Sequence, residues 1–190
     1  MKRVIDFCLA LICIILFSPL FIICYVAIRL EDGGPAFFKQ ERIGLGGKPF
    51  NILKFRSLST DGEREEYALF KHEKNENLTH TGRFLRDHHL DELPQLFNVL
   101  KGDMAFIGPR PERKYYIDLI MEKDSRYRLL YQIRPGVTSY ATLYNGYTDT
   151  MEKMLIRLEM DLYYLQHQSL LLDGKILIQT FIYIVFGKKF

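Results

Sequence analysis

The clearest feature of the hydrophobic pattern is an uncharged run of 22 residues, 7–28, which Ser18 and Pro19 interrupt near its centre. A helix of that length extends about 33 Å, which is enough to cross a bilayer. Pro19 has no backbone donor, however, and its ring disrupts the preceding turn. A kink there leaves two arms of roughly 13–17 Å, each about half the thickness of a hydrocarbon core. The pattern therefore predicts a broken helix that could enter and leave a membrane on the same side.

The flanks of this run are basic at both ends: Lys2 and Arg3 precede it, and Arg29, Lys39 and Arg42 follow it. Basic residues tend to stay on the cytoplasmic side of a membrane, so a re-entrant segment satisfies both flanks better than a crossing does. A kinked spanning helix is the alternative, because neighbouring groups can satisfy the carbonyl that proline leaves free. A cleaved signal peptide is disfavoured, since the run is long and no small-x-small site follows it.

Residues 31–190 provide enough chain for one compact domain, and their pattern predicts an α+β fold that is mostly helical. Apolar and aromatic positions predict strands at 36–40 and 50–56. On the second strand Lys54 and Arg56 project from the same face, two residues apart. Two cations placed in this way suggest an anion site, but this pattern alone favours a solvated edge strand.

A helix is predicted from Asp91 to Lys101, with Gly102 ending it. Asp91 is suited to cap this helix, and Pro94 is tolerated in the first turn, where a missing donor costs little. Glu92 allows a second interpretation: adjacent carboxylates at a helix start, kept ionised by the helix amides, could bind a divalent cation while one attacks phosphorus. Spacing alone favours the capping role. The apolar face of the helix is expected to comprise Leu93, Leu96, Phe97 and Leu100.

The loop 107–111 holds Arg110 between Pro109 and Pro111, which restrict the backbone on both sides. A guanidinium held in this way can bind a phosphate through two parallel hydrogen bonds. An exposed loop arginine fits the same pattern, so both interpretations stay open.

The rest of the chain is predicted to be mainly helical. Residues 112–133 are predicted as one long helix, 134–147 as a turn and an extended stretch, and 149–152 as the capping box of a further helix. Asp161 lies beside the apolar face of that helix and is either a solvated residue or a functional acid. The charged segment 61–77 is predicted as a surface helix and loop. The apolar face near Asp161 comprises Met151, Leu155, Leu158, Leu162 and Leu165.

The last apolar stretch, 176–186, is too short to span a membrane. With Lys188 and Lys189 behind it, a helix at the membrane interface fits. A buried helix that closes the domain is the alternative.

Composition excludes several classes of site. The net charge of +3 suits anionic lipids or phosphates but is far from the pattern of a nucleic-acid-binding protein. The three cysteines, Cys8, Cys13 and Cys24, all lie in the apolar run. The domain is therefore expected to have neither a disulfide nor a cysteine metal site, which suits the reducing cytosol. The histidines show no ligand spacing.

Several motifs, taken in order, resemble those of the bacterial sugar transferases. These are the small monotopic phosphoglycosyl transferases that start glycan assembly on polyprenyl phosphate. The motifs are Lys2, Arg3 and Asp6, the central Ser18 and Pro19, KFRS at 54–57, LDELPQLFNVLKGDM at 90–104, IGPRP at 107–111, RPGVT at 134–138 and DLYYLQHQSLLLDGKILIQT at 161–180. No single motif is decisive, but their order and spacing cover nearly the whole chain.

The resemblance implies a re-entrant membrane helix over residues 1–30, broken at Ser18 and Pro19. Residues 31–190 would form a catalytic domain on the cytoplasmic face of the bacterial inner membrane, held there by interfacial helices and membrane lipids. The implied reaction requires Mg²⁺ and transfers a sugar-1-phosphate from a UDP-sugar to polyprenyl phosphate, at the start of glycoconjugate or exopolysaccharide assembly. Nucleic acid is not an expected partner, and a homodimer is compatible with the resemblance.

The resemblance also implies roles for particular residues. Asp91 would attack the β-phosphate of the UDP-sugar, release UMP and carry the phosphosugar. Glu92 would act as metal ligand or general base, and both carboxylates would hold the metal. The remaining residues would bind the phosphates and order the site; they are Lys54, Arg56, Arg86, Arg110, Arg134 and Asp161.

Two stretches depart from the family pattern. Asp87, His88 and His89 stand where the family often has Lys, Thr or Ser, and SYATLYNGY at 139–147 replaces a small and tryptophan-containing stretch. The second departure bears on the fit of donor or acceptor and leaves the sugar open. Two other function classes stay open as well. One is a membrane phosphohydrolase that releases UMP continuously without a lipid acceptor, and the other is a nucleotide-sugar-binding scaffold without turnover.

Overall fold

The protein has an α+β fold in which helices predominate, as predicted. A computed structural model describes residues 1–59, 78–146, 148 and 150–186, so the segment predicted as a surface helix and loop at 61–77 lies outside the described residues. The helices are α1 (Lys2–Leu16), α2 (Ser18–Asp32), α3 (His80–Asp87), α4 (Gln95–Lys101), α5 (Lys114–Lys123), α6 (Tyr140–Asn145), α7 (Met151–His167) and α8 (Leu170–Val185). The strands are β1 (Phe37–Ile43), β2 (Pro49–Phe55), β3 (Ala105–Ile107) and β4 (Gly136–Thr138).

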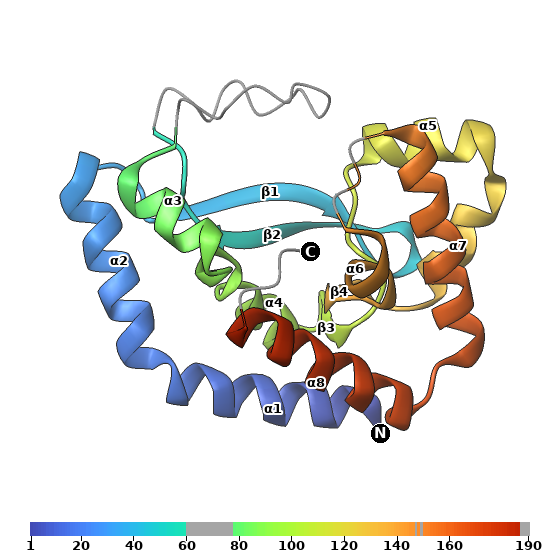
Figure 1. Cartoon of the computed structure of the whole chain (residues 1–190), viewed down its shortest axis with the longest axis horizontal. Coiled ribbons are helices and arrows are strands. Elements are labelled where there is room, and N and C mark those ends of the chain that lie inside the picture. Colours follow the sequence, from blue (N-terminus) through green and yellow to red (C-terminus); the bar gives the residue numbers. More distant parts are fainter. Residues whose placement is uncertain (60–77, 147, 149, 187–190) are drawn as a thin grey trace.

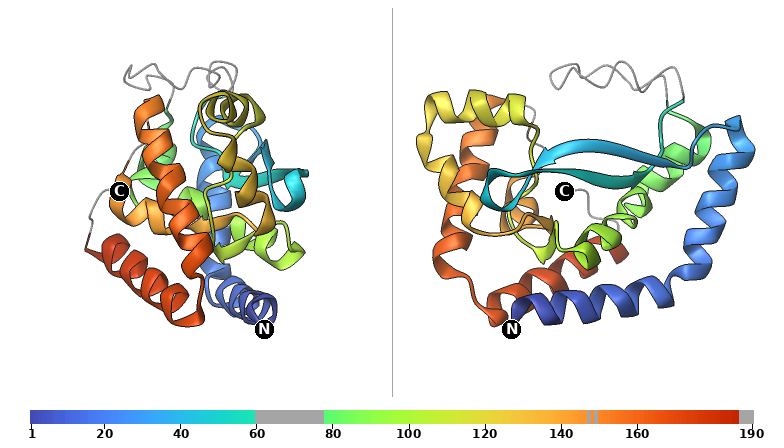
Figure 2. Two further views of the ribbon diagram at one scale, coloured as in Figure 1. Left: turned by 90° about the vertical axis from the view of Figure 1, so that its right-hand side faces the viewer. Right: turned by 180° about the vertical axis from the view of Figure 1, so that it is seen from behind.

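The fold contains two small sheets among the described residues. β1 and β2 form a long antiparallel ribbon, and β3 and β4 form a short parallel pair. The ribbon crosses the middle of the molecule in Figure 1, with α2 and α3 at one end and α5 and α7 at the other. The further views in Figure 2 agree with Figure 1 that α1 and α8 lie on the same side of the molecule.

The first strand is longer than predicted. It runs to Ile43 rather than ending at residue 40, which makes Arg42 a strand residue. The chain then reverses through Gly46 and Gly47, whose positive φ angles of 68° and 72° suit glycine. Because residues 38 and 40 lie opposite 54 and 52, Arg42 and Lys54 project from the same face of the ribbon.

The predicted break in the N-terminal helix is present. α1 and α2 meet at Phe17 with a bend of 62°, and Pro19 lies in the first turn of α2, where no backbone donor is needed. Within the described residues no single helix has the length and apolar character to cross a membrane, whereas the bent pair taken together does. The re-entrant arrangement and the division of the chain at residue 30 stay predictions.

Polar residues at the start of α1 are bound to the rest of the protein. The ammonium of Lys2 donates to the Ile107 carbonyl at 2.9 Å and to the Tyr164 hydroxyl at 2.8 Å, and it pairs with Asp173 at 2.8 Å. Asp6 is buried and accepts a hydrogen bond from the Phe106 amide at 3.3 Å. The first helix is therefore attached to β3 and to the junction of α7 and α8.

The helix predicted from Asp91 begins later. A single 3-10 turn spans Leu90–Glu92, and α4 starts at Gln95 with Pro94 as its N-cap residue. The prediction that Asp91 caps this helix is wrong, because the chain tightens through hydrogen bonds of the 3-10 type before Pro94. The predicted end is confirmed, since Gly102 is left-handed with φ 96°.

The buried face of α4 also differs from the prediction. Phe97, expected in the core, is 40% exposed, whereas Asn98 is buried. The Asn98 side chain accepts from the Leu53 amide at 2.9 Å and donates to the Asn51 carbonyl at 2.8 Å. The helix thus turns a polar residue toward β2, because that residue completes the backbone hydrogen bonds of the strand.

The long helix predicted at 112–133 is two shorter elements, α5 and a 3-10 segment, Ser125–Gln132. Asp124 separates them, because its side chain accepts from the Arg126 amide at 2.9 Å and so caps the second element. Within the described residues of the stretch predicted as extended at 134–147, only β4 is a strand. It gives way to α6, because the Ser139 hydroxyl accepts from the Thr142 amide at 2.9 Å and caps a helix there.

The last two helices close the domain. α7 is capped by Thr150, one residue later than predicted, and Asp149 lies outside the described residues. The predicted apolar face is confirmed in outline, since Leu158 and Leu162 are buried in the largest core cluster with Tyr116 and Ile117.

α8 is longer than the apolar stretch that predicted it and has two different faces. Ile176 is buried, whereas Leu171 is 88% and Phe181 66% exposed. The alternative of a buried closing helix therefore holds for one face only, because the other face is exposed. The interfacial location stays a prediction.

We predict that Asn98→Ala lowers the free energy of unfolding by about 2–4 kcal/mol, because each buried group left without a partner costs about 1–3 kcal/mol. Urea denaturation would measure the change. Lys101→Ala is the matched control on the same helix, since the Lys101 side chain is 74% exposed, and it should change stability by less than about 0.5 kcal/mol. Equal effects of the two substitutions would contradict the structural role of Asn98.

Candidate active site

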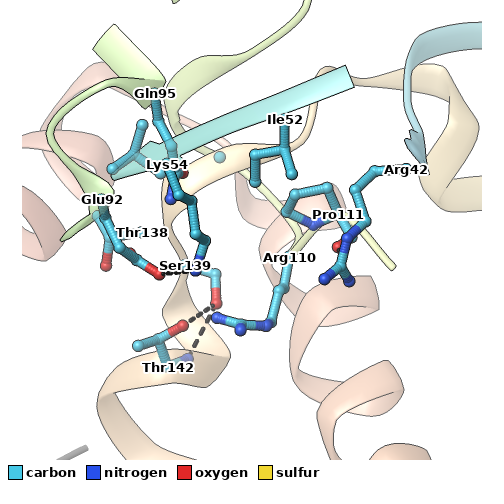
Figure 3. A pocket seen from close by; sticks show the side chains of 12 residues that line it. Arg42, Ile52, Lys54, Glu92, Gln95, Arg110, Pro111, Thr138, Ser139 and Thr142 are labelled. Atoms are coloured by element: carbon cyan, nitrogen blue, oxygen red, sulfur yellow. Dashed lines mark hydrogen bonds and ion pairs between the residues drawn. The ribbon is translucent and has the colours of Figure 1, made fainter. Parts of the chain in front are cut away.

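Segments from five parts of the chain enclose a polar pocket, which we call the cationic pocket (Figure 3). Its cations are Arg42 on β1, Lys54 on β2 and Arg110 in the loop after β3, and its one carboxylate is Glu92. The pairing of β3 with β4 brings the Arg110 loop beside the start of α6. The full lining comprises Arg42, Ile52, Lys54, Glu92, Gln95, Arg110, Pro111, Gly136, Val137, Thr138, Ser139 and Thr142.

Lys54 and Glu92 form an ion pair inside the pocket, with 2.7 Å between the Lys54 Nζ and Glu92 Oε1 atoms. Burial by itself would raise the pKa of the Glu92 carboxyl. The positive charges of Lys54 and Arg110 outweigh burial and lower this pKa to about 2. Glu92 is therefore a carboxylate at every physiological pH.

The adjacent carboxyl group of Asp91 has the opposite tendency. Asp91 is 7% exposed, and burial raises its pKa, with a smaller contribution from the negative charge of Glu92. Lys54 and Arg86 act against this rise. The expected stabilisation of the Asp91 carboxylate by capping a helix is absent from the described structure, because Asp91 does not cap one. Consecutive residues thus hold carboxyl groups of different acidity, an arrangement typical of acid–base and nucleophilic sites.

The structure brings only some of the predicted substrate-binding residues together. Lys54 and Arg110 line the pocket beside Glu92. Arg86 donates to the Ser57 hydroxyl at 2.7 Å and lies close enough to Asp91 to lower its pKa.

Three other predicted residues lie away from the lining of this pocket. Arg56 is 2% exposed and pairs with Asp32 at the end of α2. Arg134 donates to the Gly102 carbonyl at 2.8 Å, at the end of α4. Asp161 is 3% exposed in the interior. The contacts of Arg56 and Arg134 hold elements of the domain together.

Arg42 is a pocket cation that the sequence analysis missed as a site residue. Its guanidinium donates to the Pro111 carbonyl at 3.2 Å and lies 3.7 Å from the Glu112 carboxylate. Glu112 also pairs with the buried Arg157 at 3.1 Å. The predicted strand ended at residue 40. The alternation of side chains along β1, which places Arg42 on the same face as Lys54, therefore lay beyond the prediction.

Asp161 lies behind this group, beside Arg157. Burial raises the pKa of Asp161 to about 7, because desolvation and the charge of Glu112 outweigh the attraction of Arg157. Asp161 is thus a buried acid next to the residues that hold Arg42, rather than a solvated one.

The donor set fits a metal ion only in part. Within the described residues no group of three or more His, Cys, Asp or Glu side chains could hold a metal. Asp91 and Glu92 supply two carboxylates, and Mg²⁺ is commonly held by one or two carboxylates together with waters and substrate phosphates. The pair therefore suits a cation that shares its coordination with the substrate.

The family comparison covers nearly the whole chain. The model of the family described as bacterial sugar transferase matches residues 1–187. The chain belongs to the bacterial sugar transferase family. The resemblance first seen in the motifs is thereby confirmed.

Curated relatives share this region. The chain is 40% identical over 179 residues to the UDP-N-acetylgalactosamine-undecaprenyl-phosphate N-acetylgalactosaminephosphotransferase of Aeromonas hydrophila, a match that covers 94% of the chain and 42% of the relative. It is 41% identical over 181 residues to the UDP-glucose:undecaprenyl-phosphate glucose-1-phosphate transferase of Caulobacter vibrioides, a match that covers 94% of the chain and 67% of the relative. It is also 39% identical over 180 residues to the uncharacterized sugar transferase EpsL of Bacillus subtilis, a match that covers 95% of the chain and 85% of the relative. The chain thus spans less than half of the Aeromonas relative.

We predict that Lys54→Met raises the pKa of Glu92 from about 2 toward or above its ordinary value of 4.5, because the ion pair is lost while the carboxyl stays partly buried. In the parent protein the ion pair should contribute stability above pH 4.5 and lose it as the pH falls through about 2. An NMR titration of labelled glutamate carboxyl carbons measures the pKa. Lys101→Met is the control and should leave the pKa of Glu92 unchanged. If Lys54→Met also left this pKa unchanged, the charge of Lys54 would not be its cause.

Proposed function

We propose that this protein transfers a sugar-1-phosphate from a UDP-sugar to polyprenyl phosphate through a covalent intermediate on Asp91. The observation that carries the proposal is the pair of consecutive carboxyl groups, Asp91 and Glu92, beside a pocket lined by three cations. Family membership and the undecaprenyl-phosphate transferases among the relatives support the same reaction.

In the first step an oxygen of the Asp91 carboxylate attacks the β-phosphorus of the UDP-sugar. A new Asp–O–P bond forms, the bond from the β-phosphorus to the bridging oxygen breaks, and UMP leaves with that oxygen. In the second step a phosphate oxygen of the polyprenyl phosphate attacks the same phosphorus. The bond to Asp91 breaks, and polyprenyl diphosphate sugar is released. A covalent intermediate divides the transfer between two unlike substrates into two steps.

The pocket residues stabilise the charges that these steps develop. Lys54, Arg110 and Arg42 would neutralise the phosphate oxygens as the negative charge moves to the leaving UMP. Glu92, ionised at neutral pH, would hold the metal together with Asp91. Bound Mg²⁺ would polarise the phosphate oxygens and favour the ionised form of Asp91, against the effect of its burial.

We further propose that the protein acts at the cytoplasmic face of the inner membrane. Many large apolar side chains of α1, α2 and α8 are exposed, among them Ile12, Ile15, Ile22, Leu171 and Phe181. An acceptor with a polyprenyl tail requires a site near the lipid surface, and these helices would provide the contact with lipid.

The relatives leave the sugar undecided. Those from Aeromonas and Caulobacter are named for N-acetylgalactosamine and glucose, yet the chain is about equally identical to both. Overall identity therefore does not select the donor, which depends on the side chains that contact the sugar.

We predict that Asp91→Asn abolishes UMP release, because the amide lacks the anionic oxygen that attacks phosphorus. Asn has nearly the same shape, so the variant should fold. Incubation of the parent with a UDP-sugar and Mg²⁺, without acceptor, should add one sugar phosphate to the intact mass at Asp91. A fully active Asn variant, or a label on another residue, would falsify the covalent assignment. Continuous UMP release without acceptor would instead indicate the phosphohydrolase, and binding without release the scaffold.

The topology prediction concerns the break at Ser18 and Pro19. A cysteine added ahead of Met1, in a chain with the three native cysteines replaced, should resist an impermeant label applied from the periplasm. A cysteine at position 101 in the domain should resist it too. Replacing Ser18 and Pro19 by leucines should straighten the segment and expose one end, because the helix break is removed. Labelling of the N-terminal cysteine from the periplasm, in the chain that keeps Ser18 and Pro19, would contradict the re-entrant form.

A further inference from the structure

Part of the wall of the cationic pocket is polar but uncharged. Ser139 and Thr142, at the start of α6, and Gln95, at the start of α4, all line the pocket. In Figure 3 the Arg110 side chain reaches toward the Ser139–Thr142 pair. Without charge these three side chains contribute little to neutralising phosphate, so they suit a neutral part of the ligand.

Ser139 and Thr142 form a fixed pair of hydroxyl groups. Ser139 is 1% exposed, its hydroxyl accepts from the Thr142 amide at 2.9 Å, and the two hydroxyl oxygens are 2.8 Å apart. Each hydroxyl has one proton to donate and two lone pairs. One proton serves the bond between the two groups, so the pair retains a donor and free lone pairs whichever group donates.

Gln95 provides a second observation that points to a ligand. It is 2% exposed and lines the pocket, and its side-chain amide forms no hydrogen bond with another described residue. Its amide atoms are not among the fully buried side-chain atoms of the described residues that lack a partner, so they reach the pocket. A ligand that both donates and accepts hydrogen bonds would find both functions in this amide.

We propose that Ser139, Thr142 and Gln95 form the subsite that recognises the sugar of the donor through its hydroxyl or acetamido groups. This inference rests on the proposed function. The sugar is the neutral, hydroxyl-rich part of a UDP-sugar, and its groups donate and accept as the three side chains do. The pocket cations Arg42, Lys54 and Arg110 would bind the diphosphate. A site built to bond a substrate hydroxyl discriminates strongly, because a missing partner leaves its own polar groups unpaired.

The test uses binding rather than turnover. Dissociation constants of UDP, UDP-glucose and UDP-N-acetylgalactosamine are measured on the Asp91→Asn protein, which cannot consume them. Thr142→Val removes the hydroxyl and keeps the shape, whereas Thr142→Ser keeps the hydroxyl and is the matched control. Gln95→Met removes the amide at similar volume. Thermal melts confirm that each variant is folded, and Gln95→Met tests the subsite independently if Thr142→Val unfolds.

We expect Thr142→Val and Gln95→Met each to weaken the tighter-binding UDP-sugar by roughly three- to tenfold, the loss expected of one neutral hydrogen bond. The dissociation constant of UDP should stay within about twofold of its value in the Asp91→Asn protein, and Thr142→Ser should leave all three dissociation constants unchanged. Equal weakening of UDP and UDP-sugar would overturn the inference, because the wall would then bind the ribose. Unchanged constants would overturn it too, leaving a structural role. Failure of the proposed function is distinguishable, since it would appear as absent UMP release and labelling by the parent protein.

Discussion

The ion pair between Lys54 and Glu92 connects the two halves of the site. Lys54 belongs to the β1–β2 ribbon, and Glu92 belongs to the short turn before α4. Their contact at 2.7 Å sets the distance between β2 and the carboxyl pair, and it keeps Glu92 ionised while the adjacent Asp91 is less acidic. Without a cation at this position the pocket would hold two neighbouring carboxyl groups in partly desolvated surroundings, where like charges raise each other's pKa.

The buried charged residues behind the pocket hold one of its cations, Arg42, in position. Glu112 lies between Arg42 and Arg157, so it can hold one guanidinium at the pocket and satisfy another in the interior. Asp161 lies beside Arg157 and has a pKa near 7. Removing one partner from such a buried group leaves an uncompensated charge, which is far more costly than the loss of a surface ion pair. The position of Arg42 therefore depends on residues far from it in sequence.

Several predictions of helix bounds were wrong because local spacing did not reveal which polar side chain would form a hydrogen bond to the backbone. Asp124 divides a segment read as one helix, and Ser139 starts a helix in a stretch read as extended. Asp91 had a good capping sequence, but the 3-10 turn before Pro94 moved the start of the helix to Gln95. In each case a single hydrogen bond or turn, worth about 1 kcal/mol, selects between two locally acceptable backbones.

The sequence by itself determined the features that act within a few residues: the break near Pro19, the end of α4 at Gly102 and the order of the family motifs. These features depend on the backbone dihedral angles that a residue type allows and on the missing backbone N–H of proline, which are properties of the residue itself. Only the tertiary structure decided which cations converge. Lys54, Arg110 and Arg42 line the pocket, whereas Arg56 and Arg134 bind Asp32 and a helix-end carbonyl. Charge is visible in a sequence, but its burial and its partner depend on strand register and on packing between residues distant along the chain.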